Sequence, residues 1–261
     1  RWYIVNKSII SSFETEGFNP FTSDISVLRK ILGDLKNSFD FSSIKTIYYY
    51  GAGISSKNKT IEVKNLLQTF FVKSIIELNS DLLGSCRALC SNNEGVVCIL
   101  GTGSNSCYYD GKKIVHKINS LGHLLGDEGS GYDMGKKFLI KYLRDELTED
   151  IKIHFSKEFD VSKNILERLY LSNNREKFVA SISKFVYENK ENNFVHAFIH
   201  NHFNKYFDKI ILKYSCKNVY MSGSVAYYFK NEIEKIAKEK SYTINKIVKD
   251  PIKYLCDFHI K

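Results

Sequence analysis

Two glycine-rich segments constrain the fold of this chain more than any other feature of its sequence. The segment GTGSNS (101–106) follows the apolar run VVCIL (96–100), and GDEGSG (126–131) comes shortly after it. A short β-branched run that ends in small and hydroxylated residues is typical of a buried strand leading into a tight turn, whose backbone N–H groups can face an anion. The acids Asp127 and Glu128 add carboxylates for a metal or a hydroxyl group. The two segments together predict a phosphate-handling site.

The first part of the chain alternates strand and helix patterns, which favours an α/β architecture. Residues 2–13 predict an opening hairpin, and the β-branched and aromatic residues of 44–50 predict a buried strand that ends at glycine. Apolar residues at helical intervals predict a helix over 24–35, a long amphipathic helix over 61–78 and a shorter helix over 81–91.

The second part continues with the same alternation. An Asp-Gly pair is a strong hairpin signal, and small residues after a short strand indicate another junction between a strand and a helix. The expected elements are a hairpin over 106–118, a helix over 134–144, an almost entirely helical stretch over 160–214, a strand over 218–221 and a helix after Pro251.

Length and composition exclude several classes of protein. With 261 residues, 43% of them hydrophobic, the chain is long enough for one or two domains with cores of their own. The longest apolar stretch, around 66–76, is interrupted by Gln68 and Lys73 and is too short to cross a bilayer. No signal-peptide pattern occurs at the start. We therefore expect no membrane partner.

Charge and cysteine usage favour a cytoplasmic protein that binds no nucleic acid. The formal net charge is +9, but the lysines are scattered along the chain instead of forming one basic run, so we expect a solvated basic surface and no nucleic-acid partner. The six cysteines include no CxxC pair, which is typical of reduced thiols in the cytoplasm.

The order of the motifs along the chain resembles that of the BadF/BadG/BcrA/BcrD ATPase family, and within it the N-acetylglucosamine kinases. The motifs are ELNSDLLGSCRAL, ILGTGSNS, GHLLGDEGSGYDMG, MSGSVAYYF and DPIKYLCDFH. The likeness covers nearly the whole chain, whereas neither GxxxxGK[ST] nor GxGxxG is present. The resemblance implies membership of the actin, Hsp70 and sugar kinase superfamily.

This resemblance implies a fold and an activity. The fold is α/β, with two ribonuclease-H-like (actin-like ATPase) domains that close an interdomain cleft on ATP, Mg²⁺ and a sugar. The expected domains are 1–94, 95–247 and a C-terminal helix over 248–261 that packs back on the first domain. The implied enzyme is an ATP-dependent amino-sugar kinase, which transfers the γ-phosphoryl group to the 6-hydroxyl of N-acetylglucosamine or a related sugar.

The resemblance assigns the catalytic role to Asp81. It matches the family's aspartate that accepts the proton of the attacking hydroxyl, and phosphoryl transfer needs such a base within hydrogen-bond reach of the nucleophile. The alternative is structural, because an aspartate after Asn79-Ser80 is equally natural as the cap of the helix that begins there.

Two short runs match the family's phosphate and nucleotide turns. The matching residues are Gly101, Thr102, Gly103, Ser104, Gly223, Ser224, Val225 and Ala226. In the first run small residues let phosphoryl oxygens approach the backbone, and in the second they let the adenosine side lie close to it. An ordinary hairpin entry and close helix packing would require the same residue types.

The implied sugar site draws on both halves of the chain. Its residues are Asn19, Gly51, Thr102, Asn105 and Asp127. Asn before Pro is also an ordinary turn signal, and glycine also ends strands. We expect Glu128 only to cap or support its loop.

No metal site is expected in the segment HAFIHNH (196–202). His196 and His200 have the spacing of a zinc protease, but Ala197 replaces the glutamate that such a site needs. We expect these histidines and His202 to lie on an exposed or capped face of a helix.

The chain departs from the family at its start. Family members begin with a strand and a DSGSTKT-like turn, the first phosphate loop, and Arg1 falls where that turn would have ended. We expect truncation or disorder there, and efficient catalysis only with the loop. Kinase activity of residues 1–261 equal to that of a version with the loop restored would contradict this expectation.

Two other functions fit the same family resemblance. Some members are ATPases that activate a dehydratase through an iron-sulfur cluster, but the chain offers no convincing pair of cysteine-bearing helices for one. The other candidate function is that of a regulator that binds nucleotide or sugar without catalysing a reaction. The expected partners are a small-molecule sugar and ATP. The sequence chooses neither the sugar nor the oligomeric state, for which a homodimer is one candidate.

Overall fold

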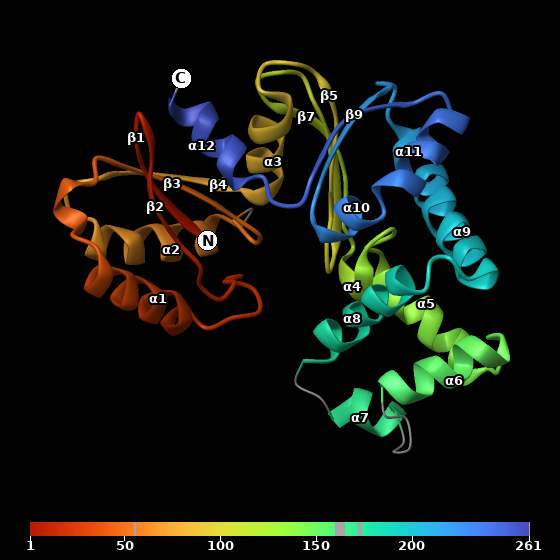
Figure 1. The fold of residues 1–261 in the computed structure, drawn as a ribbon. Coiled ribbons are helices and arrows are strands. Elements are labelled where there is room, and N and C mark those ends of the chain that lie inside the picture. Colours follow the sequence, from red (N-terminus) through yellow and green to blue (C-terminus); the bar gives the residue numbers. More distant parts are fainter. Residues whose placement is uncertain (55, 160–164, 172–173, 261) are drawn as a thin grey trace. The chain divides into compact units, whose positions relative to one another are not determined.

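The structure is a computed structural model that describes residues 1–54, 56–159, 165–171 and 174–260. The chain divides into two compact units, both seen in Figure 1. Unit 1 comprises Arg1–Asn92 and Pro251–Lys261, and unit 2 comprises Asn93–Asp250.

Unit 1 contains two pairs of strands. The opening hairpin is confirmed: β1 (Trp2–Asn6) pairs antiparallel with β2 (Ser8–Phe13). The strands β3 (Thr46–Gly51) and β4 (Ile75–Ser80) pair in parallel. Parallel strands end at the same edge of a sheet, so the pairing of Gly51 with Ser80 brings the segments that follow β3 and β4 together.

The helices of unit 1 differ from the expected ones at one place. They are α1 (Ile25–Ser38), α2 (Lys57–Phe70), α3 (Asp81–Cys90) and α12 (Ile252–Ile260). The long helix expected over 61–78 is wrong, because α2 ends at Phe70 and the chain turns into β4. Ile75 and Ile76 fit the helical spacing, but they are β-branched and gain the hydrogen bonds of the β3 pairing.

Alternate residues of β3 face opposite sides, as the period of a strand requires. Ile47 and Tyr49 pack against the buried cluster that α1 and α2 form with Ile76. On the other side, Tyr48 stacks on His259 of α12 with ring centroids 3.7 Å apart, and the Tyr50 hydroxyl is 2.8 Å from His259 Nε2. The strand pair of unit 1 is thus covered by α1 and α2 on one face and by α12 on the other (Figure 1).

Unit 2 is built on a five-stranded mixed sheet with the order β7-β6-β5-β8-β9. Its strands are β5 (Gly95–Leu100), β6 (Ser104–Tyr109), β7 (Ile114–Ile118), β8 (Asn218–Ser222) and β9 (Thr243–Val248). The hairpin expected over 106–118 is confirmed as the antiparallel pair β6 and β7. Because β5, β8 and β9 run parallel, the glycine turns after β5 and β8 lie at one edge.

The helices of unit 2 are α4 (Gly122–Leu125), α5 (Gly131–Leu143), α6 (Glu149–Glu158), α7 (Ile165–Leu171), α8 (Arg175–Glu188), α9 (Asn193–Lys209), α10 (Ser224–Tyr228) and α11 (Lys230–Glu239). The helix expected after the second glycine segment is α5. The helical stretch expected over 160–214 is confirmed where the chain is described, while residues 160–164 and 172–173 lie outside the described part.

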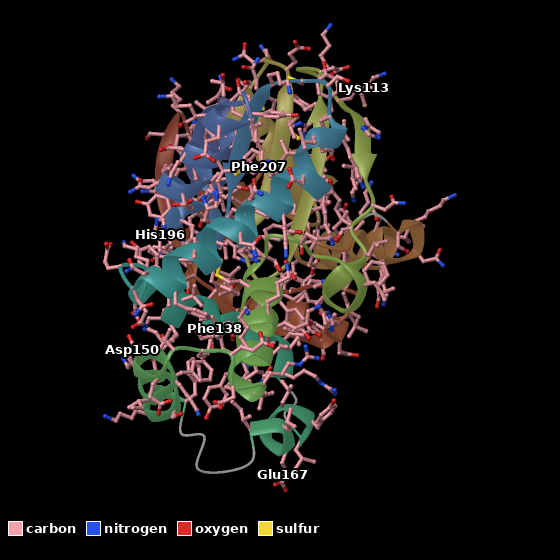
Figure 2. The ribbon with its side chains drawn as sticks, turned by 90° about the vertical axis from the view of Figure 1, so that its right-hand side faces the viewer. Lys113, Phe138, Asp150, Glu167, His196 and Phe207 are labelled. Carbon is pink, nitrogen blue, oxygen red and sulfur yellow. The ribbon has the colours of Figure 1, made fainter. Side chains whose placement is uncertain are left out.

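Aromatic side chains fill the core of unit 2. Phe138 of α5 lies 5.3–5.7 Å, between ring centroids, from Phe155, Phe185 and Phe198, and it is fully buried, as is Phe207 of α9 (Figure 2). Burying one such side chain is worth about 1.5–3 kcal/mol, so this cluster fixes the helices against the sheet. In the part of the chain that is described, no helix has the length and apolar character to cross a membrane.

Candidate functional site

In unit 1, the end of β4 places Asp81 at the first position of α3. Ser80 is the cap of this helix, since its Oγ accepts a hydrogen bond from the Leu83 N–H at 3.2 Å. The Asp81 Oδ1 atom accepts from the Leu82 N–H at 2.8 Å, and the residue is half-buried. The cap residue is therefore Ser80, while Asp81 also satisfies an N–H group of the first turn, so the structural alternative for Asp81 is met in part. Its role as a base stays a prediction.

Asn19 lies beside the turn that follows β3. Its Oδ1 accepts from the Phe21 N–H at 3.0 Å, which confirms the Asn-Pro segment as a turn. Gly53 has a φ of +78°, and a Cβ there would lie 2.6 Å from the Asn19 Oδ1. Only glycine adopts this conformation readily and leaves room for the amide. Unit 1 thus gathers Asn19, Gly51 and Asp81 at the edge where β3 and β4 end.

In unit 2, the two glycine-rich segments are hydrogen-bonded to each other. The Gly101 N–H donates to the Gly103 carbonyl at 3.0 Å, which closes the turn between β5 and β6. The Gly131 N–H donates to the Gly101 carbonyl at 2.8 Å, and the Tyr132 N–H donates to the Thr102 carbonyl at 3.1 Å. Thr102 is exposed, and nothing lies within 4 Å of a Cβ placed on Gly101. The turn therefore has open space beside its backbone.

The carboxylate of Asp127 lies over the first glycine turn. A Cβ on Gly103 would be 2.8 Å from the Asp127 Oδ2, and the Ser120 Oγ donates to the Oδ1 at 3.2 Å. Burial raises the pKa of Asp127, while hydrogen bonds from the Ser104 backbone and Ser120 lower it. A partly desolvated carboxylate with fixed donors suits binding of a hydroxyl group, because a new donor would replace lost water.

A small polar cavity connects Asp127 with Asn105. Its volume is about 20 Å³, enough for roughly one water molecule. The polar side chains that line it belong to Ser104, Asn105, Ser106, Asn119, Ser120, Asp127, Glu128 and Tyr206. The Asn105 Oδ1 accepts from the Ser106 N–H at 3.0 Å. The structure thus brings two of the predicted sugar residues, one from β6 and one from the second glycine segment, to the same cavity.

The turn after β8 joins the same edge. Gly223 has a φ of +110°, and a Cβ there would lie 2.2 Å from the Leu100 carbonyl oxygen. Its N–H donates to the Val248 carbonyl of β9 at 3.0 Å. Ser224, Val225 and Ala226 then begin α10, and the Val225 Cγ2 lies 3.3 Å from a Cβ placed on Gly131. Close packing, one of the two readings of these small residues, is thus present; nucleotide contact stays a prediction.

The histidines of α9 separate into two environments. The His200 Nδ1 lies 2.6 Å from the Glu232 Oε1, and the His196 Nε2 lies 3.6 Å from the Glu232 Oε2. His202 is only 3% exposed, so the expectation of an exposed helix face is wrong for this residue. Among the residues that the structure describes, no three His, Cys, Asp or Glu side chains are grouped as metal ligands.

Sequence reasoning missed the side chains that surround the second glycine segment. Ser120, Asp133, His202 and Tyr206 contact this segment or its neighbours, but they belong to a loop, to α5 and to α9. Of these residues only Asp133 could have been found from local sequence, because an acidic residue in the first turn of a helix is favoured by the helix dipole. Glu128, expected to support the loop, lies 3.8 Å from Lys209 Nζ.

Comparison with solved structures reveals similar proteins. A putative N-acetylglucosamine kinase from Porphyromonas gingivalis has a TM-score of 0.92 and 31% identity, over 99% of this chain and 94% of that one. A putative N-acetylglucosamine kinase from Chromobacterium violaceum has a TM-score of 0.64 and 12% identity, over 93% of this chain and 87% of that one. A putative sugar kinase from Cytophaga hutchinsonii has a TM-score of 0.51 and 14% identity, over 90% and 85%.

The second and third of these likenesses show the fold alone, which is the mixed α/β fold of actin-like sugar kinases. No protein-family model matches the chain, and no curated protein matches it. The likeness to the BadF/BadG/BcrA/BcrD ATPase family therefore rests on the motifs.

Proposed function

The chain belongs to the family of the putative N-acetylglucosamine kinase from Porphyromonas gingivalis, and on that premise we propose that it is an ATP-dependent amino-sugar kinase. The reaction is transfer of the γ-phosphoryl group of ATP to the 6-hydroxyl of N-acetylglucosamine or a related sugar. The observation that supports it best is the edge of unit 2, where the turns at Gly101–Gly103, Gly131 and Gly223 pack together beside the Asp127 carboxylate.

Each turn has the properties that its proposed ligand requires. The open space beside Gly101 lets phosphoryl oxygens approach backbone N–H groups, which favour anions. The turn at Gly223 packs on the Leu100 backbone, and in this proposal the small residues that follow it, Ser224 to Ala226, let the adenosine side of the nucleotide lie close to the chain. Asn105 and Asp127 line the same small polar cavity, and in this proposal their side chains form hydrogen bonds with hydroxyl groups of the sugar.

Asp81 is the proposed base. In this proposal Asn19 and the turn after β3 orient the sugar, and the Asp81 carboxylate accepts the proton of the attacking hydroxyl as the new P–O bond forms. Its hydrogen bond from the Leu82 N–H and its place at a helix N-terminus favour the ionised form. An ionised carboxylate is the state in which it can take the proton.

Mg²⁺ is expected to arrive with the nucleotide. The described residues supply no cluster of three ligands, whereas Mg²⁺ in kinases is commonly held by substrate phosphates, water and one or two carboxylates. When bound, it neutralises charge on the phosphoryl oxygens. The neighbouring turns supply backbone N–H donors for the phosphoryl oxygens.

The test is an ATP-consumption assay on the full-length protein with N-acetylglucosamine, N-acetylmuramic acid, glucosamine and glucose. We expect ADP release that depends on at least one of these sugars and on Mg²⁺. Absence of sugar-dependent ADP release with all four would contradict the proposal, while an equal rate with and without sugar would point to an ATPase instead.

The variant Asp81→Asn tests the base directly. It keeps the side-chain shape and the oxygen that accepts from Leu82 but removes the basic carboxylate, so we expect kcat to fall on the order of a hundredfold to ten-thousandfold. Asp110→Asn is the matched control, because the Asp110 Oδ1 also accepts neighbouring backbone N–H groups, from Lys112 and Lys113, in the β6–β7 turn. Equal kcat values for the two variants would exclude Asp81 as the base.

A further inference from the structure

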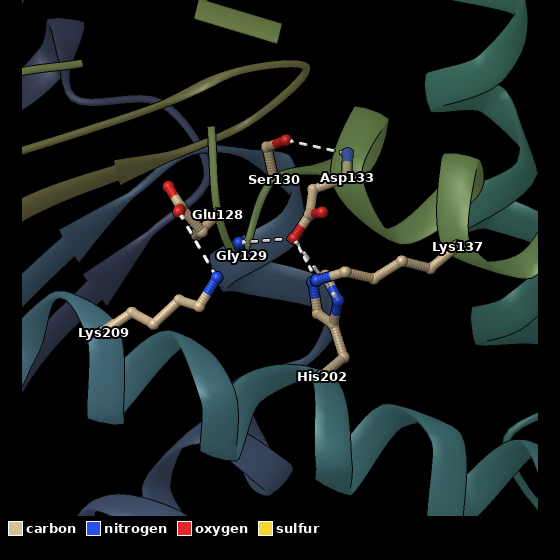
Figure 3. A network of polar contacts seen from close by, with 7 residues as sticks. All are labelled: Glu128, Gly129, Ser130, Asp133, Lys137, His202 and Lys209. Carbon is tan, nitrogen blue, oxygen red and sulfur yellow. Dashed lines mark hydrogen bonds and ion pairs between the residues drawn. The ribbon is translucent and has the colours of Figure 1, made fainter. Parts of the chain in front are cut away.

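A buried aspartate that the proposed reaction does not use lies behind the second glycine segment. Asp133, with a side chain 6% exposed, is in the first turn of α5. Its Oδ2 accepts a hydrogen bond from the Gly129 N–H at 3.2 Å and forms an ion pair with the Lys137 Nζ at 2.7 Å (Figure 3). The Asp133 N–H donates a hydrogen bond to the Ser130 Oγ at 3.1 Å. One carboxylate thus joins the loop over 126–131 to the helix that follows it.

Helix α9 forms the other wall of this loop. Gly129 has a φ of +79°, and a Cβ there would lie 2.6 Å from the Tyr206 ring, so the loop backbone packs directly on that ring. Lys209 Nζ lies 3.8 Å from the Glu128 Oε1, and the His202 Nδ1 lies 3.8 Å from the Asp133 Oδ2 (Figure 3). Residues spaced by three and four share one face of a helix, so a single face of α9 contacts both the loop and its anchor.

The residue that this anchor serves is Asp127. It has a φ of +55°, which is uncommon for a non-glycine residue, although aspartate adopts this region more readily than most. From this backbone conformation its carboxylate lies beside Gly103 and accepts a hydrogen bond from Ser120. The Gly129 N–H, two residues later, is where Asp133 holds the loop.

We propose that Asp133 is a positioning residue: by holding the Gly129 N–H between α5 and α9, it keeps the loop over 126–131 in the conformation that presents the Asp127 carboxylate to the sugar. This inference rests on the proposed function for its catalytic consequence, whereas its structural content, the holding of the loop, is independent of the substrate. Asp133 acts only through the loop and contacts neither reactant.

Three variants separate the contribution of the Asp133–Gly129 hydrogen bond from that of the Asp133–Lys137 ion pair. Asp133→Ala removes both the hydrogen bond to Gly129 and the ion pair, and Asp133→Asn can keep the hydrogen bond while it loses the charge. Asp208→Asn is the matched control, because Asp208 of α9 forms an ion pair with Lys240 at 2.6 Å and lies outside the loop's contacts. A positioning role predicts graded effects, largest for Asp133→Ala and intermediate for Asp133→Asn.

Two readouts on the full-length protein test the inference. Hydrogen exchange of the amides over 126–131 should accelerate on the order of tenfold or more in Asp133→Ala relative to Asp208→Asn, since loss of an anchoring hydrogen bond favours local opening. The sugar KM should rise on the order of tenfold, with the ATP KM within about twofold of wild type, because only the sugar contact depends on Asp127.

The outcomes distinguish this inference from the proposed function. Loop exchange in a folded Asp133→Ala variant equal to that of Asp208→Asn overturns the positioning role, whatever the kinetics. If the wild-type protein shows no sugar-dependent ADP release, the proposed function fails, and the exchange measurement still decides whether Asp133 holds the loop. If Asp133→Ala does not fold, Asp133→Ser, whose hydroxyl is too short to replace the carboxylate at the Gly129 N–H, is compared with Asp208→Asn by the same exchange criterion.

Discussion

His202 makes the stability of unit 2 depend on pH, and the variant His202→Asn isolates this effect. The pKa of the His202 imidazole is lowered from 6.5 to about 4, mainly by burial and also by the charges of Lys137 and Lys205, while the Asp133 carboxylate opposes the shift. Among the residues that the structure describes, neither ring nitrogen has a hydrogen-bond partner, and the Asp133 Oδ2 lies 3.8 Å from the Nδ1. The imidazole is therefore neutral in the folded protein at neutral pH.

The sign and size of the effect follow from the two pKa values. The unfolded chain binds the proton more readily than the folded one, so acidification favours unfolding as the pH falls from about 6.5 toward about 4. Each pKa unit corresponds to about 1.4 kcal/mol, which gives about 3 kcal/mol for the full range. Between pH 7 and pH 5 the expected loss in the free energy of unfolding is about 2 kcal/mol.

Urea unfolding, followed by far-UV circular dichroism at the two pH values, measures this loss. His202→Asn should lose about 2 kcal/mol less than wild type between pH 7 and pH 5, whatever its stability at pH 7. Phe203→Leu is the control, since it changes a buried neighbour on α9 without removing a titrating group and should keep the wild-type dependence. A His202→Asn protein with the wild-type pH dependence would show that His202 does not cause the loss of stability at pH 5.

Two further predictions concern glycines at the candidate site. Gly223→Ala places a Cβ 2.2 Å from the Leu100 carbonyl oxygen at a φ of +110°, so the free energy of unfolding, measured by thermal unfolding, should fall by about 2–4 kcal/mol. Gly33→Ala in α1 is the control, because nothing lies within 4 Å of a Cβ there. This variant should leave the free energy of unfolding unchanged or raise it by up to about 1 kcal/mol. Gly103→Ala displaces the Asp127 carboxylate, so the KM for the sugar, measured by steady-state kinetics, should rise on the order of tenfold. An unchanged KM would show that Asp127 does not bind the sugar.

Local sequence signals predicted the glycine turns because their cause is local. A β-branched run followed by glycine specifies a buried strand and a turn within a few residues, and the structure has these features at Gly101 and Gly223. Strand β4 was hidden for the opposite reason. Ile75 and Ile76 continue the helical spacing of the preceding residues, and only pairing with β3, far away in the sequence, makes them a strand.

The side chains around the loop over 126–131 could be found only in three dimensions. Asp133 is close to the loop in sequence, but its partner His202 and the Tyr206 ring belong to α9, which no local pattern connects with the loop. The histidine spacing on α9 suggested a surface face, whereas packing buries His202 and leaves His196 beside Glu232. Which face of a helix is buried depends on the neighbours that the fold supplies.

The proposed reaction is transfer of a phosphoryl group from ATP to an amino sugar. Mass spectrometry of N-acetylglucosamine after incubation with the full-length protein, ATP and Mg²⁺ tests it most directly, with glucosamine, glucose and N-acetylmuramic acid in parallel reactions. We expect at least one sugar to gain a phosphoryl group on its 6-hydroxyl, with one ADP released for each phosphosugar formed. Release of ADP and inorganic phosphate with all four sugars unchanged, or no ADP at all, would contradict it.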